Sequence, residues 1–176
     1  MNRQIDVVIP VYKPDARFRK LLQMLMIQSV QPRQILLINT EKELLDIHLL
    51  EGLEEENEQS AGAAGPVIRL EHIRKMDFDH GGTRHRAAGM LQREMILFMT
   101  QDAVPKDNRL IERLLEPFEN TQVCASYACQ LPQKDCGLLE RYSRSFNYPL
   151  QSRIKTAKDL PELGIKTYFC SNVCAV

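Results

Sequence analysis

Several features that define common protein classes are missing from this sequence. The 23 lysines and arginines are balanced by 23 aspartates and glutamates, so the basic excess of a nucleic-acid-binding surface is absent. No apolar run approaches the roughly 20 residues of a membrane-spanning helix, and the polar N-terminus does not resemble a signal peptide. The five cysteines include no CxxC pair. Reduced, partly buried thiols in a cytoplasmic protein, Cys124 and Cys129 among them, therefore fit better than a zinc site.

The 176 residues are enough for one domain with a substantial core, and we treat 1–176 as a single domain. Short apolar runs alternate with segments of helical periodicity, which predicts an α/β fold with a mainly parallel sheet. The predicted strands are 5–9, 34–38, 67–73, 96–99 and 123–129, and the predicted covering helices include 17–28 and 108–115. Asp15 and Asp107 are placed to cap those two helices.

The stretch ILFMTQDAVP, residues 96–105, joins a short apolar run to polar residues at its end. An apolar run of this length, bounded by Pro105, is typical of a strand that is buried on both faces. Asp102 follows its carboxyl end, which is where open α/β sheets bind ligands. A carboxylate there suits a divalent cation. A turn or helix-capping aspartate is the simpler interpretation of this residue taken alone.

A second polar stretch, DHGGTRHRAA, spans residues 79–88. Its two glycines allow backbone amides to face a ligand, and Thr83 can cap a helix beginning there. A helix N-terminus attracts anions, whereas Arg84, His85 and Arg86 in a first turn would oppose the helix dipole. A bound phosphate would resolve that conflict, so we predict an anion site, with side chains that splay into solvent as the alternative.

Three further expectations concern the end of the first strand, a helix in the last third of the chain, and the C-terminal run. Pro10 has no N–H, so the first strand should stop there. Leu138, Leu139, Tyr142 and Phe146 mark an amphipathic helix. The run 167–176 is β-rich and ends without a cap, turn or polar tail, so we expect the chain to be the N-terminal part of a longer catalytic domain.

In chain order, the segments VVIPVYKP, ILLINT, HGGTRHRAA and ILFMTQDAVP resemble the inverting glycosyltransferases of family 2. HGGTRH, TQDAVP, LERYSRSFNYP and YFCSNVCAV are more similar to the bacterial rhamnosyltransferase branch. The resemblance spans almost the whole chain. It implies the GT-A fold, a Rossmann-like, mainly parallel sheet flanked by helices. It also implies a nucleoside diphosphate sugar donor, dTDP- or UDP-linked, and a saccharide or lipid-linked acceptor of cell-surface polysaccharide. The likeness to the rhamnosyltransferase branch implies rhamnose as the sugar.

The resemblance assigns the nucleoside side of the site to two strand exits. Pro10, Val11 and Tyr12 match the exit of the first strand, which lies along the nucleoside in the family. Asn39 and Thr40 match the exit of the second strand. The family usually has a base-reading aspartate there, so the uncharged Asn39 is a departure from the pattern.

The resemblance assigns the diphosphate side to two later segments. Gly82, Thr83 and Arg84 match the segment that lines the nucleotide pocket. The tripeptide Thr100-Gln101-Asp102 matches the DxD motif, which holds a divalent metal, Mg²⁺ or Mn²⁺, on the sugar diphosphate. With a threonine in the first position, Asp102 is the one clear carboxylate, helped by diphosphate oxygens and water.

The implied mechanism is a single displacement at the anomeric carbon, in which a base deprotonates the acceptor hydroxyl and the metal neutralises the leaving diphosphate. The family's base is a carboxylate that follows the DxD motif, usually in an acidic pair, and no such pair follows Val173. Asp159 and Glu162 fit surface positions better, so no catalytic base is assigned. We expect these residues to bind a nucleoside diphosphate without transferring sugar, in the cytoplasm or peripherally at the inner membrane face.

Two other classes of protein share part of this pattern. A nucleotidyltransferase has the sheet and the metal-binding aspartate, but it normally shows a glycine-rich, basic loop where this chain has VYKPDARF. A dinucleotide-binding dehydrogenase needs GxGxxG at the same place, and that motif is absent. A nucleotide-sugar-binding module without turnover is the third possibility.

Overall fold

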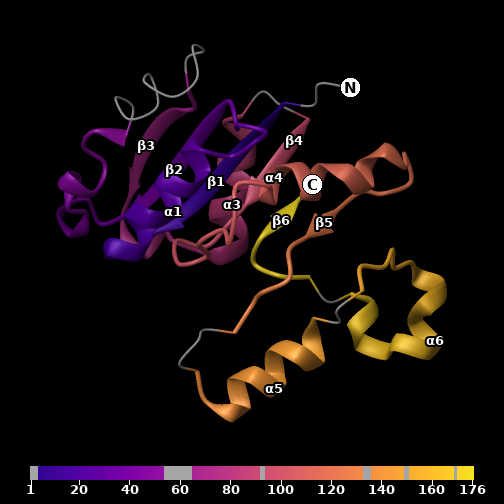
Figure 1. Cartoon of the computed structure of the whole chain (residues 1–176). Helices are drawn as coiled ribbons and strands as arrows, with labels where there is room; N and C mark the ends of the chain where they lie inside the picture. The colour runs from indigo at the N-terminus through magenta and orange to yellow at the C-terminus, as the bar shows by residue number, and fades with distance from the viewer. Residues whose placement is uncertain (1–3, 54–64, 92–93, 133–135, 149–150, 169) are drawn as a thin grey trace. The chain divides into compact units, whose positions relative to one another are not determined.

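The computed structural model describes residues 4–53, 65–91, 94–132, 136–148, 151–168 and 170–176. The strands are β1 (Ile5–Val11), β2 (Gln34–Thr40), β3 (Val67–Ile73), β4 (Met95–Phe98), β5 (Ser126–Tyr127) and β6 (Cys174–Ala175). The α-helices are α1 (Ala16–Met26), α3 (His80–Gly89), α4 (Leu110–Leu115), α5 (Leu138–Asn147) and α6 (Leu160–Leu163) (Figure 1). The chain divides into two compact units, residues 1–126 with 172–176 and residues 127–171.

The sheet has the strand order β3-β2-β1-β4-β6-β5. β1 pairs in parallel with β2 on one side and with β4 on the other, and β2 pairs in parallel with β3. On the far side of β4, β6 pairs with it in the antiparallel direction. The predicted parallel arrangement of the three central strands is therefore confirmed. Its consequence is that β1, β2, β3 and β4 all end at the same edge of the sheet.

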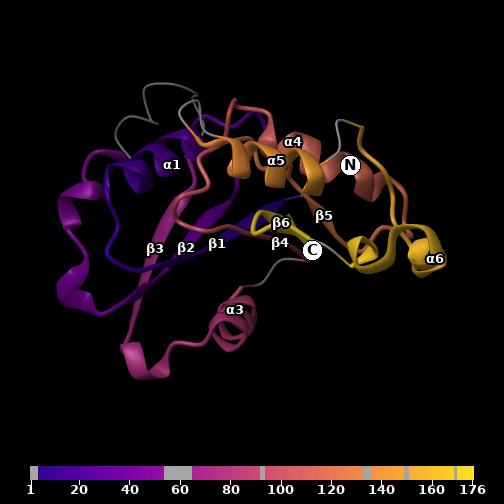
Figure 2. The same cartoon turned by 90° about the horizontal axis from the view of Figure 1, so that it is seen from below.

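Helices cover the central strands on both faces, with α3 on one side and α1 and α4 on the other (Figure 2). On the α3 side, Ala87 packs against Val8, Leu36 and Ile38, all of them buried. On the opposite side α1 buries a stripe at helical spacing, Phe18, Leu21, Leu22, Leu25 and Met26. Each such side chain contributes about 1.5–3 kcal/mol to the free energy of unfolding, so the sheet that carries the strand exits is rigidly held.

The prediction that β1 ends at Pro10 is wrong, because β1 pairs with β2 through Pro10 and Val11. The carbonyl of Val8 accepts a hydrogen bond from Met99 N at 3.0 Å, so Val8 points toward β4. Pro10 lies two residues later and points the same way. Its missing N–H faces the side where the β4 ladder has already stopped at Phe98, so the β1–β2 ladder loses no bond.

The predicted outer strands are shorter in the structure than in the sequence analysis. Of residues 123–129 only β5 forms, and of residues 167–176 only β6 forms, preceded by a 3₁₀ helix at Gly164–Thr167. The reason is that β4 is itself short and offers β6 just two paired positions, Leu97↔Ala175 and Phe98↔Cys174. All five cysteines are free thiols, but Cys124 and Cys129 are exposed, not partly buried as predicted.

Helix starts match the predictions to different degrees. Asp15 caps α1 as predicted, with its carboxylate accepting from Arg17 N at 2.9 Å. The second predicted helix begins later than residue 108, at Leu110, with Arg109 in the capping position. The carboxylate of Asp107 instead accepts from Arg109 N at 3.0 Å, which fixes the turn before the helix.

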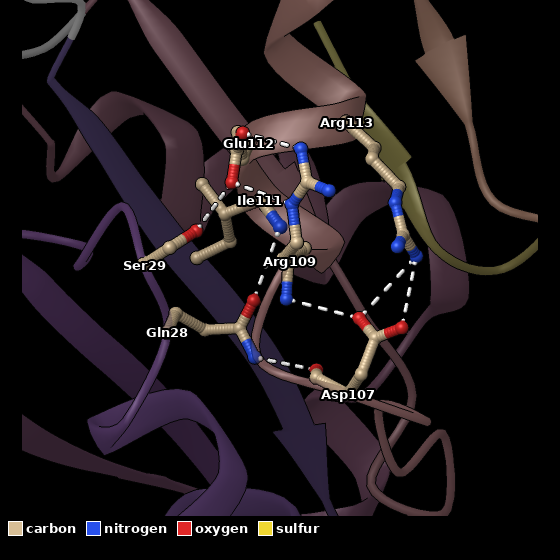
Figure 3. Close-up of polar contacts among 7 residues, drawn as sticks. All are labelled: Gln28, Ser29, Asp107, Arg109, Ile111, Glu112 and Arg113. Atoms are coloured by element: carbon tan, nitrogen blue, oxygen red, sulfur yellow. Dashed lines mark hydrogen bonds and ion pairs between the residues drawn. The ribbon is translucent and has the colours of Figure 1, made fainter.

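A polar network joins the end of α1 to the start of α4 (Figure 3). The buried Gln28 amide donates to the carbonyl of Asp107 at 3.0 Å and accepts from Ile111 N at 3.2 Å. Beside it, the carboxylate of Glu112 accepts from Arg109 at 2.8 Å and from the Ser29 hydroxyl at 2.7 Å. The Arg109 hydrogen bond, followed by that of Ser29, lowers the pKa of Glu112 from 4.5 to about 2.

The second unit holds α5, α6 and the 3₁₀ helices Ala157–Asp159 and Gly164–Thr167. The amphipathic helix predicted around residues 138–146 is confirmed as α5, but none of its residues is buried. Leu138 and Leu139 are 85% and 86% exposed, and Tyr142 stacks on Phe146 with 6.0 Å between ring centroids. No helix in the described part of the chain is both long and apolar enough to cross a membrane.

The Glu112 network predicts a specific pH dependence of stability. Because the pKa of Glu112 is depressed in the folded chain, its ionised form stabilises the fold above pH 4.5, and this contribution disappears as the pH falls toward 2. Glu112→Gln should therefore lower the urea midpoint at pH 7, and the gap to the wild-type protein should close between pH 4.5 and 2. A gap that stays constant or widens in acid would contradict this assignment.

Candidate functional site

Tyr12 and Gln101, 89 residues apart in the sequence, meet at the edge where the parallel strands end. Tyr12 directly follows β1, and its side chain is 39% exposed. The side-chain oxygen of Gln101 accepts from Tyr12 N at 2.7 Å, and its Nε2 donates to Tyr12 O at 3.0 Å. The structure thus brings together two of the predicted site residues, by way of the Tyr12 main chain.

The other two residues of the tripeptide lie in a tight turn after β4. Thr100 O accepts from Ala103 N at 3.1 Å, and the Thr100 hydroxyl accepts from Asn172 Nδ2 at 2.7 Å. Asp102 is exposed next to these anchored residues. No group of three His, Cys, Asp or Glu side chains in the described ranges could hold a metal ion by itself. A single exposed carboxylate fits a hard cation whose remaining ligands come from a diphosphate and from water.

Asn39 and Thr40 end β2, next to β1, with Asn39 in register with Val11. The Asn39 side-chain amide nitrogen donates to Glu41 O at 3.1 Å and contacts His72 Nδ1, also at 3.1 Å. Because Glu41 O can only accept, the amide nitrogen must face it, and Oδ1 points elsewhere. Among the described residues, neither Asn39 Oδ1 nor Thr40 Oγ1 has a hydrogen-bond partner, although both are buried. Each is an unsatisfied acceptor, and because Asn39 is fully buried and Thr40 nearly so, a ligand N–H or O–H group would reach them only after the β2 exit opens.

Sequence reasoning missed four residues at this edge, Lys13, Glu41, His72 and Lys75. Lys13 lies two residues after the end of β1, and Glu41 directly follows β2. Their φ values are 48° and 63°, which non-glycine residues rarely adopt and which concentrate at functional sites. The Glu41 carboxylate accepts from Lys75 N and so joins the exits of β2 and β3. His72 could have been found from strand register, because β2 and β3 pair over seven residues and this pairing places His72 opposite Asn39.

Two ammonium groups flank the Tyr12 ring. Lys13 Nζ lies 5.4 Å and Lys75 Nζ 5.9 Å from the ring centroid. Both distances fall within the range of cation–π attraction, which is worth about 0.5–1 kcal/mol at an exposed site. The positive charges favour an anionic ligand beside the ring, and the ring offers a planar surface on which a nucleobase can stack.

The predicted start of α3 is wrong. The helix begins at His80, with Asp79 as its N-cap, and not at Thr83. The Asp79 carboxylate accepts from Gly82 N, and the buried Thr83 hydroxyl accepts in return from Asp79 N at 3.3 Å. The Gly82 amide is therefore engaged in the cap and does not face a ligand. Arg84 and the two residues after it lie in the second turn, so the predicted conflict with the helix dipole is weaker.

Arg84 makes its hydrogen bond within α3, from Nη1 to His80 O at 2.9 Å. Partial burial lowers the pKa of its guanidinium below the usual value. Of the four residues predicted to share one site, Tyr12, Asn39 and Asp102 all lie at the carboxyl edge of adjacent strands. Arg84 lies on α3, which packs across β1 and β2 through Ala87, and its contact with a ligand stays a prediction.

The family model and the curated relatives that match this sequence all indicate a glycosyltransferase. Residues 6–176 match Glycosyl transferase family 2. The O-antigen chain rhamnosyltransferase RfbN of Salmonella typhimurium is 32% identical over 170 residues, which are 96% of this chain and 50% of that protein. The O-antigen chain rhamnosyltransferase WbaN of Salmonella anatum is 39% identical over 101 residues, 57% of this chain and 32% of that protein. The chain thus spans half of the first relative and about a third of the second.

Solved structures agree on the fold. A mannosyltransferase from Pyrobaculum calidifontis, in complex with GDP-Man and Mn²⁺, superposes with a TM-score of 0.59 at 13% identity, over 80% of this chain and 38% of that one. Glucosyl-3-phosphoglycerate synthase from Mycobacterium tuberculosis, in complex with UDP, has a TM-score of 0.53 at 14% identity, over 99% and 56%. The predicted GT-A fold is confirmed.

The capping role of Gly82 can be tested with the glycine beside it. A Cβ at position 82 would lie 2.7 Å from the Asp79 carboxylate, whereas one at position 81 would lie at an ordinary 3.7 Å. Gly81→Ala should stabilise the protein by about 0.5–1 kcal/mol through helix propensity. Gly82→Ala should be less stable than Gly81→Ala by about 0.5–2 kcal/mol, the value of an N-cap. Equal urea midpoints for the two variants would contradict the assignment.

Proposed function

Because this chain belongs to glycosyl transferase family 2, we propose that it is the nucleotide-sugar-binding part of an inverting, metal-dependent glycosyltransferase. The donor is a nucleoside diphosphate sugar, dTDP- or UDP-linked, and the acceptor is a saccharide or lipid-linked saccharide of a cell-surface polysaccharide. The proposed sugar is rhamnose, because both curated relatives are named rhamnosyltransferases. We propose residues 1–176 as one functional domain.

The observation that carries this proposal is the hydrogen-bonded contact between the β1 exit and the tripeptide that contains Asp102. A nucleoside diphosphate has a flat base at one end and a diphosphate at the other. The Tyr12 ring offers a stacking surface for the base, and Asp102 offers a carboxylate for a cation on the diphosphate. Gln101 joins the two by hydrogen bonds of 2.7 and 3.0 Å.

In this proposal Pro10, Val11 and Thr40 complete the nucleoside side of the site, and Asn39 reads the base. The unsatisfied acceptor of Asn39 matches bases that present a ring N–H, as uracil and thymine do, and because Asn39 is fully buried this contact requires the β2 exit to open on binding. An aspartate would offer a similar acceptor with a negative charge. The Asn39 side chain needs no charge for this role, because Glu41 O and His72 already hold its amide in the required orientation.

The proposed metal ligand is Asp102, with Mg²⁺ or Mn²⁺ as the ion. When bound, a divalent cation would supply charge neutralisation on the leaving diphosphate. The mannosyltransferase from P. calidifontis was solved with Mn²⁺, which supports the choice of ion for the test. Lys13 and Lys75, whose ammonium groups lie beside the Tyr12 ring, would add longer-range attraction for the anionic nucleotide.

Sugar transfer also needs a base that removes the acceptor hydroxyl proton, and no residue is assigned to that role. Asp159 and Glu162 are engaged locally. Asp159 accepts from Thr156 N at 2.6 Å, and its pKa is lowered chiefly by that bond. Both carboxylates lie near Arg153, at 3.5 and 3.8 Å. This engagement supports the alternative proposal, in which these 176 residues bind a nucleotide sugar without turnover.

The proposed metal role of Asp102 makes a binding prediction. Asp102→Asn should keep the fold but lose most of the gain in dTDP and UDP affinity that Mn²⁺ gives the unaltered protein, measured by titration calorimetry with and without the ion. Glu119→Gln, which removes an exposed carboxylate on the 3₁₀ helix Glu116–Glu119, is the matched control. Unchanged Mn²⁺ dependence in Asp102→Asn would rule out Asp102 as the ligand. Failure of the unaltered protein to bind any nucleoside diphosphate would refute the proposed function.

Turnover separates the two proposals. An assay of transfer and hydrolysis with dTDP-rhamnose and UDP-sugars, in the presence of Mn²⁺, should give rates at least about 10²–10⁴-fold below those of a full-length relative if the base is lacking. Comparable rates would show that the base lies within these residues.

We also propose a cytoplasmic location with peripheral contact at the inner face of the membrane. The support is α5, whose exposed Leu138, Leu139, Tyr142 and Phe146 lie on the same helix as Arg141 and Arg144. Helices of this kind bind at the surface of anionic bilayers. The protein should co-sediment with phosphatidylglycerol vesicles better than with phosphatidylcholine vesicles. Replacing Leu138 and Leu139 by serine should abolish the difference. Equal sedimentation with both kinds of vesicle, before and after the leucine replacements, would contradict the proposal.

A further inference from the structure

The side chain of Gln101 takes the place of a neighbouring strand for Tyr12. The β1–β4 ladder ends at Val8↔Phe98, with a last bond from Met99 N to Val8 O at 3.0 Å. Four residues further along, Tyr12 has its N–H and its carbonyl bound to a single amide group, the Gln101 side chain. A parallel strand such as β4 would provide these two bonds from two different residues, whereas here one side chain provides both.

The orientation of the Gln101 amide follows from the chemistry of its partners. Tyr12 N–H can only donate and Tyr12 O can only accept, so Oε1 must face the first and Nε2 the second. Both bonds, at 2.7 and 3.0 Å, have good length. They use the two polar ends of the side chain on the main chain of Tyr12, which leaves Gln101 poorly suited to contact a nucleotide itself.

The three residues of the tripeptide therefore have different roles, two as anchors and one as an exposed carboxylate. Thr100 is held by Asn172 through a 2.7 Å hydrogen bond, and Gln101 is held by Tyr12. Asp102 follows them in the same tight turn and is the exposed residue of the three. On the other side of the contact Lys13 adopts a φ of 48°, a conformation that costs energy and persists only when its surroundings enforce it. The two Gln101 hydrogen bonds fix the main chain of Tyr12, directly before Lys13, and so help to hold Lys13 in this conformation.

From this geometry we propose that Gln101 is a positioning residue, which couples the Tyr12 ring to the Asp102 carboxylate without touching the donor. The inference rests on the proposed function, in which the ring holds the base and the carboxylate holds the cation on the diphosphate. Because one rigid contact sets the spacing between the two, the base and the cation-bound diphosphate bind in one register. A cation should then raise nucleotide affinity only while the contact is intact.

Two variants test this proposal. Gln101→Leu removes both hydrogen bonds at similar volume. Gln101→Glu keeps the acceptor for Tyr12 N–H but places a second carboxylate oxygen against Tyr12 O, which is repulsive. Gln151→Leu, an exposed glutamine in the second unit, is the control. Thermal melts should show all three variants folded. If Gln101→Leu alone fails to fold, Gln101→Glu carries the test.

The first measurement needs no ligand. Amide hydrogen exchange at Tyr12, followed by NMR, should become at least tenfold faster in both Gln101 variants and stay unchanged in Gln151→Leu. Unchanged exchange at Tyr12 would overturn the proposal, whether or not the protein binds nucleotides.

The second measurement is dTDP affinity with and without Mn²⁺. In the unaltered protein Mn²⁺ should tighten binding. In the Gln101 variants affinity in Mn²⁺ should fall about tenfold, equivalent to about 1.4 kcal/mol, and the ratio of affinities with and without Mn²⁺ should shrink. A merely structural role would weaken both affinities alike, so a preserved ratio would overturn the coupling. No binding by the unaltered protein, together with faster Tyr12 exchange in the variants, would refute the proposed function while leaving the Gln101–Tyr12 contact established.

Discussion

Parallel pairing of β1 with a strand on each side is the constraint on which the candidate site depends. The register that sets Val11 beside Asn39 and Val8 beside Phe98 brings the residues after β1, β2 and β4 to one edge of the sheet. Burial of Val8, Leu36 and Ile38 under α3, and of the α1 stripe on the other face, holds that register. A one-residue slip would turn each of these side chains to the opposite face, so packing and site geometry are specified together.

At this edge the chain departs from regular structure in ways that serve a ligand better than they serve stability. Lys13 and Glu41 adopt positive φ values, Asn39 and Thr40 bury acceptors that no described residue satisfies, and two ammonium groups crowd one tyrosine ring. The positive φ values and the unsatisfied acceptors each cost a small amount of free energy in the absence of a ligand, and the two like charges repel each other. An anionic ligand with a flat, N–H-bearing end would offset all of them, which is the physical content of the nucleoside diphosphate proposal.

The central strands could be predicted because their apolar runs are short, continuous and bounded by polar residues or prolines, and the structure reproduces them within one or two residues. Side-chain partners over long separations could not. Nothing local predicts that Gln101 binds the main chain of Tyr12, 89 residues away. The Asp79 cap on the Gly82 amide was a local signal that the sequence analysis missed, because aspartate is a preferred N-cap residue. The extension of β1 through Pro10 was missed for a related reason, since the effect of the absent N–H depends on which neighbour it faces. Outer strands failed because their length is set by β4, not by their own sequence.

The central claim is that the edge formed by β1, β2 and β4 binds a nucleoside diphosphate between Tyr12 and Asp102. A crystal structure of the protein grown with dTDP and Mn²⁺ tests it most directly. The account predicts the thymine ring against the Tyr12 side chain, its N–H directed toward Asn39, and the metal ion between the Asp102 carboxylate and the diphosphate. A nucleotide bound at the opposite edge of the sheet, or a metal ion held without Asp102, would contradict it.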